Sequence, residues 1–127
     1  MNLEKLAGCL IIENRKVLLV KEKKDWYWKI PSGKVKDRES LRGCAIRETR
    51  EEAGVDVEIL SLFGDYSFNF KNREFYLEVY RAKIVDGTPH PNEEHLENVG
   101  WFPIESLNLN GTTPSNKLIY NDLVKKK

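Results

Sequence analysis

The chain has 127 residues, of which 40% are hydrophobic and 32% are charged, and its formal net charge is +1. This size fits a single domain over residues 1–127, and the composition is that of a folded globular protein rather than a disordered one. A near-neutral charge argues against holding nucleic acid by bulk electrostatics, and no apolar run reaches the roughly 20 residues needed to cross a bilayer. We therefore expect no nucleic-acid partner and no membrane attachment.

The N-terminus lacks the basic region, the apolar core and the small-residue cleavage site of a signal peptide. The two cysteines, Cys9 and Cys44, lie in apolar and helical patterns without CxxC spacing, which predicts buried free thiols. We expect a cytoplasmic protein. The sequence does not indicate an oligomeric state.

The N-terminal part has the pattern of a hairpin followed by a charged loop. Two apolar runs in "LAGCLIIENRKVLLV" flank the polar stretch "ENRK", which predicts two strands joined by a turn at Asn14. The stretch "KEKKDWYWKI" predicts a loop that leads into a short strand around Trp28 and Ile30. Pro31 would end that strand, and Gly33 permits a tight backbone bend.

A helix is predicted from about Glu39 to Ala53, with Asp37 as a candidate N-cap and Gly54 as the C-terminal stop. Two segments rich in β-branched and aromatic residues, "VDVEILSLFGDYSFNF" and "REFYLEVYRAKIV", predict long strands. A polar loop, a strand at "VGWFPI" and a C-terminal helix at "SNKLIYNDLVKK" complete the chain. This pattern indicates an α/β protein with a mixed sheet packed by helices.

The end of the predicted helix concentrates negative charge. At about 100° per residue, Glu48 and Glu52 lie one turn apart on a stripe that starts apolar, with Glu51 on its flank. Like charges at this spacing destabilise a helix by roughly 0.2–0.5 kcal/mol, and acids in the last turn oppose the helix dipole. Either Arg47 and Arg50 neutralise a solvated face, or a divalent cation such as Mg²⁺ supplies the positive charge through carboxylate oxygens.

The wider spacing favours the cation. From Gly33 the chain reads "GKVKDRESLRGCAIRETREEAGV", which resembles the Nudix box, G-x5-E-x7-R-E-U-x-E-E-x-G-U with U a bulky apolar residue. The residues on its fixed positions are Gly33, Glu39, Arg47, Glu48, Glu51, Glu52, Gly54 and Val55. Thr49 departs from the pattern at the first U position, where its β-branched side chain can still pack. The likeness extends to "WKIPSGK", where Ser32 replaces a glycine of the family's "PGG", and to "VGWFPIESL".

The resemblance implies a Nudix-type α/β/α sandwich that hydrolyses a nucleoside diphosphate linked to another group. It implies that Glu48, Glu51 and Glu52 bind Mg²⁺, with Mn²⁺ as a possible substitute, and that the Ser32 carbonyl oxygen is a further ligand. Arg47 would hold the glutamates by charge-assisted hydrogen bonds, with Glu39 as a partner in that network or an outer ligand.

A carboxylate must remove a proton from the attacking water, and Glu48 is our first choice for this base, with Glu51 second. Members of the family often recruit a further acid from the loop before the last strand. The stretch "PNEEHLENVGW" offers Glu93, Glu94 and Glu97, and we favour Glu94 as a metal ligand from its spacing to Trp101.

Substrate contacts are predicted at four residues outside the acids. Lys21 and Lys34 would bind phosphate, with plain solvent exposure as the alternative for each. Trp26 and Trp28 alternate along the chain, so both could face one side and stack a nucleobase; core packing is the alternative.

The box does not specify the substrate. ADP-ribose pyrophosphatases tend to carry a marker proline after the box, and diadenosine polyphosphate hydrolases a tyrosine in a similar place. In this chain residues 70–73 lie at that place and read "FKNR", so neither marker is present. A (deoxy)nucleoside triphosphate pyrophosphohydrolase is the leading expectation, ahead of a nucleotide-sugar or ADP-ribose pyrophosphatase. The alternatives from other classes are a non-catalytic nucleotide-binding regulatory module and an isomerase on the same fold.

Overall fold

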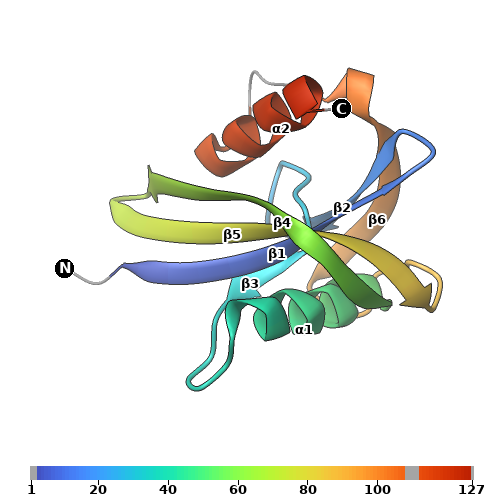
Figure 1. Ribbon diagram of the computed structural model, residues 1–127, viewed down its shortest axis with the longest axis horizontal. Helices are drawn as coiled ribbons and strands as arrows, with labels where there is room; N and C mark the ends of the chain where they lie inside the picture. The colour runs from blue at the N-terminus through green and yellow to red at the C-terminus, as the bar shows by residue number, and fades with distance from the viewer. Residues whose placement is uncertain (1–2, 108–111, 127) are drawn as a thin grey trace.

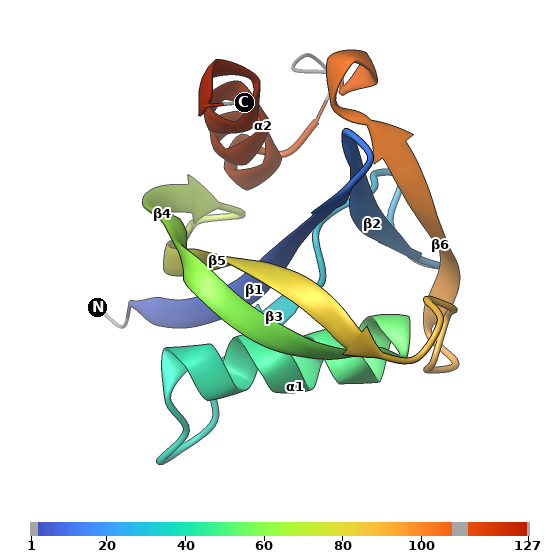
Figure 2. The same cartoon turned by 45° about the vertical axis from the view of Figure 1, so that its right-hand side comes forward.

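The computed structural model describes residues 3–107 and 112–126. Its elements are β1 (Glu4–Glu13), β2 (Lys16–Glu22), β3 (Ser32–Lys34), α1 (Leu41–Ala53), β4 (Asp56–Phe70), β5 (Arg73–Asp86), β6 (Leu96–Pro103), the 3-10 helix η1 (Ile104–Ser106) and α2 (Pro114–Lys126). Figure 1 shows α1 below the sheet and α2 above it, and the turned view in Figure 2 keeps them on opposite sides. The protein is therefore an α/β/α sandwich. No helix in these two ranges is long and apolar enough to cross a membrane.

The sheet is mixed, as the sequence predicts. Its strands follow the order β4-β5-β1-β2-β6, with β3 paired to β1. Strand β1 runs parallel to β5, whereas the other neighbouring strands are antiparallel. Strand β3, which carries Gly33, therefore lies against the central strand β1, and it also contacts α1.

The predicted hairpin between β1 and β2 is confirmed. Asn14 and Arg15 form its turn with φ angles of 52° and 63°. Two successive left-handed residues are typical of a type I′ turn, whose twist matches that of a hairpin and whose first position favours asparagine.

Alternating side chains of the central strands form a core on each face of the sheet. From β1, Ala7, Cys9 and Ile11 pack in the core beneath α1, while Leu10 packs in the core beneath α2. Cys9 and Cys44 are free and buried, as expected. Both faces of the sheet are thus covered, and α1 is held firmly against one of them.

Helix α1 begins at Leu41 rather than at Glu39, and its N-cap is Ser40 rather than Asp37. The Ser40 Oγ accepts a hydrogen bond from the backbone N–H of Gly43 at 2.9 Å. The serine hydroxyl thereby satisfies an amide that the first helical turn leaves without an internal partner.

The later start of α1 leaves Glu39 in the preceding loop, where its Oε1 accepts the backbone N–H of Lys36 at 3.0 Å. At the other end the predicted stop is confirmed. Gly54 has a φ angle of 71° and donates its N–H to the Arg50 carbonyl oxygen at 3.0 Å.

The prediction of a short strand around Trp28 and Ile30 is wrong. Only Lys29 pairs there, as an isolated bridge to Val20 with backbone hydrogen bonds of 2.8 and 2.9 Å. The strand in this region is β3, which starts after Pro31 instead of ending at it. Pro31 has no N–H to donate to β1, although its carbonyl oxygen accepts the N–H of Cys9 at 3.1 Å.

Candidate active site

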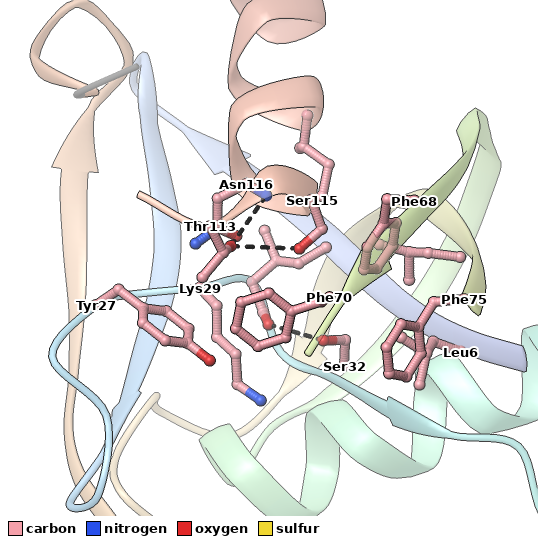
Figure 3. A pocket seen from close by; sticks show the side chains of 13 residues that line it. Leu6, Tyr27, Lys29, Ser32, Phe68, Phe70, Phe75, Thr113, Ser115 and Asn116 are labelled. Atoms are coloured by element: carbon pink, nitrogen blue, oxygen red, sulfur yellow. Dashed lines mark hydrogen bonds between the residues drawn. The ribbon is translucent and has the colours of Figure 1, made fainter. Parts of the chain in front are cut away.

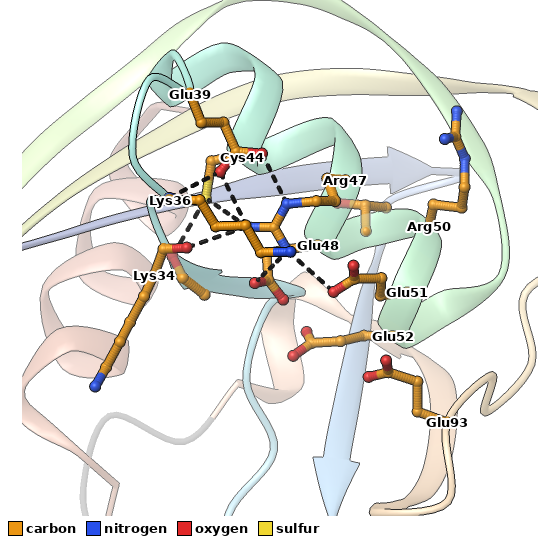
Figure 4. A network of polar contacts seen from close by, with 12 residues as sticks. Lys34, Lys36, Glu39, Cys44, Arg47, Glu48, Arg50, Glu51, Glu52 and Glu93 are labelled. Atoms are coloured by element: carbon orange, nitrogen blue, oxygen red, sulfur yellow. Dashed lines mark hydrogen bonds and ion pairs between the residues drawn. The ribbon is translucent and has the colours of Figure 1, made fainter.

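Arg47 is the centre of the polar network at the box (Figure 4). Its Nε donates to Glu39 Oε2 at 2.7 Å and its Nη2 donates to Glu39 Oε1 at 3.0 Å. Its Nη1 donates to Glu48 Oε2 at 3.1 Å and to Glu51 Oε1 at 3.0 Å. The Lys34 carbonyl oxygen accepts a further bond from Nη2 at 3.1 Å. One guanidinium thus connects the loop before α1 to two acids of its last two turns.

These contacts stabilise the charged forms of the groups involved. The hydrogen bonds from Arg47 lower the pKa of Glu39 to about 2, against the opposing effect of desolvation. The same contact raises the pKa of Arg47 above its ordinary value. Arg50 does not take part, because it pairs with Asp56 at 2.5 Å and points away from the acids in Figure 4.

Glu52 is buried, with 4% of the residue exposed. Its Oε1 accepts the backbone N–H of Ser32 at 3.0 Å, which ties the end of α1 to the start of β3. Burial raises the pKa of Glu52 to about 8; the charge of Lys29 opposes this shift and that of Glu48 adds to it. Burial also raises the pKa of Glu48, against the opposing charge of Arg47.

Lys29 is a site residue that the sequence analysis did not single out. It forms an ion pair with Glu22 at 2.9 Å and lies near enough to Glu52 for their charges to interact. Burial acts to lower the pKa of Lys29, but the charges of Glu52 and Glu22 outweigh it and the pKa is raised. A lysine between aromatic and apolar neighbours in "WYWKIP" is the signal that could have identified it.

Gly33 allows the backbone of β3 to lie directly against Glu48. A Cβ atom at this position would stand 2.2 Å from the Glu48 Cδ, so any other residue here would push the Glu48 carboxylate out of its place. The glycine of the box therefore serves the position of Glu48. The adjacent Ser32 contributes its N–H to Glu52, and its carbonyl oxygen remains a proposed metal ligand.

The acids suit a hard divalent cation in their chemistry. In Figure 4 the carboxylates of Glu48, Glu51 and Glu52 face a common space beside Arg47. Burial raises the pKa values of Glu48 and Glu52, so a bound cation would favour the charged forms of these two acids. Oxygen donors carrying such charge are the ligands that Mg²⁺ prefers. Within residues 3–107 and 112–126, no three acidic, histidine or cysteine side chains are placed to hold a metal ion together as they stand, so the metal site is a proposal from the chemistry of the acids.

The loop before β6 brings a different acid to this space from the one that we favoured. Glu93 is partly buried and its carboxylate faces the same space as that of Glu52 in Figure 4. Glu94 is exposed, and Glu97 pairs with Lys21 at 3.2 Å. Spacing within a loop does not reveal which of two adjacent side chains turns inward.

A pocket of about 150 Å³ lies on the α2 side of the sheet, next to the acids (Figure 3). Its lining includes Tyr27, Phe68, Phe70 and Phe75, which present aromatic rings to it. Lys29 and Ser32 also line the pocket, and Figure 3 shows the Lys29 side chain extending from it toward α1. The pocket and the acidic cluster therefore share a border formed by these two residues.

The polar end of the pocket is formed by the start of α2. Asn116 is only 2% exposed, and its Nδ2 donates to the Trp28 carbonyl oxygen at 2.9 Å and to Thr112 Oγ1 at 3.1 Å. These bonds fix the orientation of the amide and leave Oδ1 as its acceptor. Tyr120 donates to the same Trp28 carbonyl oxygen at 3.2 Å, so α2 anchors the loop that carries Tyr27 and Lys29.

The tryptophans and lysines predicted to contact substrate do not line this pocket. Trp26 is 68% exposed and stacks edge-on against Tyr27, whereas Trp28 packs edge-on against Phe102 in the core beneath α2. The two tryptophans do not share one side. Lys34 pairs with Glu4 at 3.3 Å and is largely exposed.

Comparison with known proteins identifies a matching family and several related proteins. The NUDIX domain matches residues 3–123. The oxidized purine nucleoside triphosphate hydrolase of Mus musculus is 29% identical over 123 residues, which cover 93% of this chain and 78% of that protein. The NAD-capped RNA hydrolase NudC of Pseudomonas aeruginosa is 33% identical over 76 residues, covering 60% of this chain but only 27% of that relative's length. The crystal structure of a MutT NUDIX hydrolase from Burkholderia pseudomallei superposes with a TM-score of 0.87 at 24% identity, covering 97% of this chain and 99% of that one, which shows a shared fold.

Proposed function

Because this chain belongs to the Nudix family of hydrolases, which act on pyrophosphate bonds of nucleoside diphosphate derivatives, we propose that it is a (deoxy)nucleoside triphosphate pyrophosphohydrolase. The observation that carries the proposal is the shared border between the acidic cluster and the aromatic pocket. A nucleotide has the same two parts, an aromatic base and a charged polyphosphate. The base would occupy the pocket, and the phosphates would extend past Lys29 to the acids.

The size and lining of the pocket support this placement. A single nucleobase fits a cavity of about 150 Å³, and base–aromatic stacking contributes about 1–3 kcal/mol per base. Phe70 lies between Tyr27 and the other two phenylalanines in Figure 3, so its ring is the central stacking surface. Asn116 also lines the pocket, so its side-chain amide offers a polar group beside the base.

The acids would hold a divalent cation, Mg²⁺ or Mn²⁺, through Glu48, Glu51 and Glu52, with Glu93 rather than Glu94 supplying the acid from outside the box. When bound, the cation offsets the negative charge that repels a nucleophile from the phosphates. Arg47 keeps Glu48 and Glu51 in fixed positions, since it binds both from one nitrogen.

Glu48 is the residue that we assign to proton removal from the attacking water, with Glu51 second. Its raised pKa makes it a stronger base than a solvated glutamate. Contact with the Gly33 backbone and with Arg47 restricts its side chain, so the carboxylate is presented in one orientation. Coupled carboxylates titrate together. Substitution of Glu48 and of Glu51, and not a pH profile alone, would therefore show which of them is the base.

A substrate panel with Mg²⁺ tests the proposal. The panel contains the common and oxidised (deoxy)nucleoside triphosphates, nucleotide sugars, ADP-ribose and dinucleotides, with separate detection of phosphate and pyrophosphate. We expect pyrophosphate release from a triphosphate, abolished by excess chelator and by Glu48→Gln. Preferred turnover of a sugar nucleotide would refute the substrate, and undiminished turnover with excess chelator would refute the metal. Tight nucleotide binding without turnover anywhere in the panel would instead support the regulatory module.

A further inference from the structure

The loop between β5 and β6 is attached to the C-terminal end of α1 by hydrogen bonds from His90 and Asn92. The last carbonyl groups of a helix have no partner within it and are usually left to water or to a capping residue. Here two of them accept backbone N–H groups from the loop: Ala53 O from His90 at 2.9 Å, and Glu52 O from Asn92 at 3.3 Å.

Asn92 makes a second bond to the same turn through its side chain. Its Nδ2 donates to the Arg50 carbonyl oxygen at 3.0 Å, and its Oδ1 lies 3.2 Å from Nε2 of His90. The other ring nitrogen of His90 lies 2.8 Å from the Thr88 carbonyl oxygen. The amide of Asn92 is therefore held from both sides, by α1 and by the loop itself.

The loop and the end of α1 pack closely against each other at Gly54. A Cβ atom on Gly54 would stand 2.3 Å from Cε1 of His90, so the imidazole lies directly on the glycine backbone. Gly87 approaches from the other side, where a Cβ would stand 2.9 Å from the Gly54 carbonyl oxygen. Gly54 thus both ends α1 and allows the loop to lie against the helix.

We propose that Asn92 is a positioning residue that sets Glu93 against the acids of α1. The proposal rests on the role given to Glu93 under the proposed function. Asn92 bonds to the backbone of Glu52, and Glu93 is the next residue, so this contact places the backbone of Glu93 beside that of Glu52. Without the side-chain bond to Arg50, Asn92 itself would be held to α1 by one N–H···O contact of 3.3 Å.

The test is a double-mutant cycle of Asn92→Ala, Glu93→Gln and the variant that carries both changes. For each protein, kcat and KM are measured on the best substrate of the panel. The affinity for Mn²⁺ is measured separately, by binding titration without substrate. Asn92→Ala should lower kcat about 10–100-fold with KM within about twofold, and it should weaken Mn²⁺ binding about 10-fold, as loss of a group that orients a ligand does. Adding Asn92→Ala to Glu93→Gln should change kcat by less than about threefold, because the residue to be positioned is already impaired.

The controls separate positioning from folding. Asn98→Ala removes an exposed asparagine on β6 whose Oδ1 accepts from its neighbour Val99, and it should leave kcat and Mn²⁺ affinity unchanged. Asn92→Asp keeps the shape of the side chain but removes the donor to Arg50, so it should reproduce the loss if Asn92→Ala fails to fold.

The outcomes distinguish the two claims. Additive losses in the double variant, or full kcat and Mn²⁺ affinity in Asn92→Ala and Asn92→Asp, would overturn the positioning role and leave the proposed function intact. Full activity of Glu93→Gln would overturn the role of Glu93 and with it the positioning role. Non-additive losses together with weakened Mn²⁺ binding would establish the proposal.

Discussion

Arg47 binds Glu39 through two hydrogen bonds, from Nε to Oε2 at 2.7 Å and from Nη2 to Oε1 at 3.0 Å. Only a guanidinium can make this paired contact and still direct a third nitrogen elsewhere. Here the third nitrogen binds Glu48 and Glu51. The geometry explains why the chain needs an arginine and a glutamate eight positions apart: the pair links the loop before α1 to the acids near its end.

Arg47→Lys should therefore lower kcat at least 10-fold although it keeps the positive charge. A lysine has no planar fork, so it cannot bind Glu39 in two places and reach the other acids at once. Arg50→Lys is the matched control, since Arg50 pairs with Asp56 on the surface, and its kcat should stay within about twofold. Steady-state kinetics of both variants check this. Equal losses in the two variants would contradict the special role of Arg47.

The same pair should stabilise the fold in a pH-dependent way. Hydrogen bonds from Arg47 lower the pKa of Glu39 to about 2, below the ordinary value of about 4.3. The stabilisation is thus present in full above the ordinary pKa and is lost as the pH falls through about 2. Glu39→Gln should melt below the parent at pH 6, and the gap should close by pH 2. Denaturation at several pH values measures the gap, and a gap that stays constant would contradict the assignment.

Glu52→Gln should nearly abolish activity without destabilising the metal-free fold. Burial raises the folded-state pKa of Glu52 to about 8, so the folded protein takes up a proton that the unfolded chain has already lost. The metal-free parent should therefore lose stability between about pH 5 and 8, at no more than about 1.4 kcal/mol per pH unit, and the variant should lack this loss. Glutamine can still accept the N–H of Ser32.

Thermal melts with and without Mg²⁺ measure both effects. The parent should gain stability from Mg²⁺, which binds the folded state, and Glu52→Gln should gain less. If the metal-free variant melts well below the parent at pH 8, then Glu52 acts mainly as a structural partner of Ser32.

Phe70→Ala should raise KM about 10-fold with little change in kcat, because loss of base stacking weakens binding by about 1–3 kcal/mol. Trp26→Ala provides the comparison, since Trp26 is 68% exposed and lies outside the lining of the pocket. Kinetics of both variants identify the stacking surface. A rise in KM in Trp26→Ala alone would place the base at the exposed loop instead.

The box and the two long strands could be predicted from sequence because their signals are local. The acids of α1 and Arg47 lie within one helix, where spacing alone determines which side chains share a face. Strand β4 and strand β5 carry long runs of β-branched and aromatic residues, and both are confirmed over almost the predicted ranges.

The remainder of the site depends on contacts between segments far apart in the chain. The pocket joins Lys29, Phe70 and Asn116, which no local pattern relates. Spacing to Trp101 favours Glu94, whereas Glu93 is the acid that follows Asn92, whose bonds to α1 no local pattern predicts. Ser40 and Asp37 both suit an N-cap, so local sequence does not distinguish them. In the structure Ser40 caps α1, which leaves Glu39 in the preceding loop, where it bonds to Arg47.

Hydrolysis in ¹⁸O-labelled water tests the central claim, that water attacks phosphorus at this site, most directly. The assay uses the preferred triphosphate with Mg²⁺, and mass spectrometry of the nucleotide and phosphate products locates the label. The account predicts ¹⁸O in one phosphate-containing product alone, with Glu48→Gln giving almost no product. Label on the nucleoside carbon side would contradict attack at phosphorus.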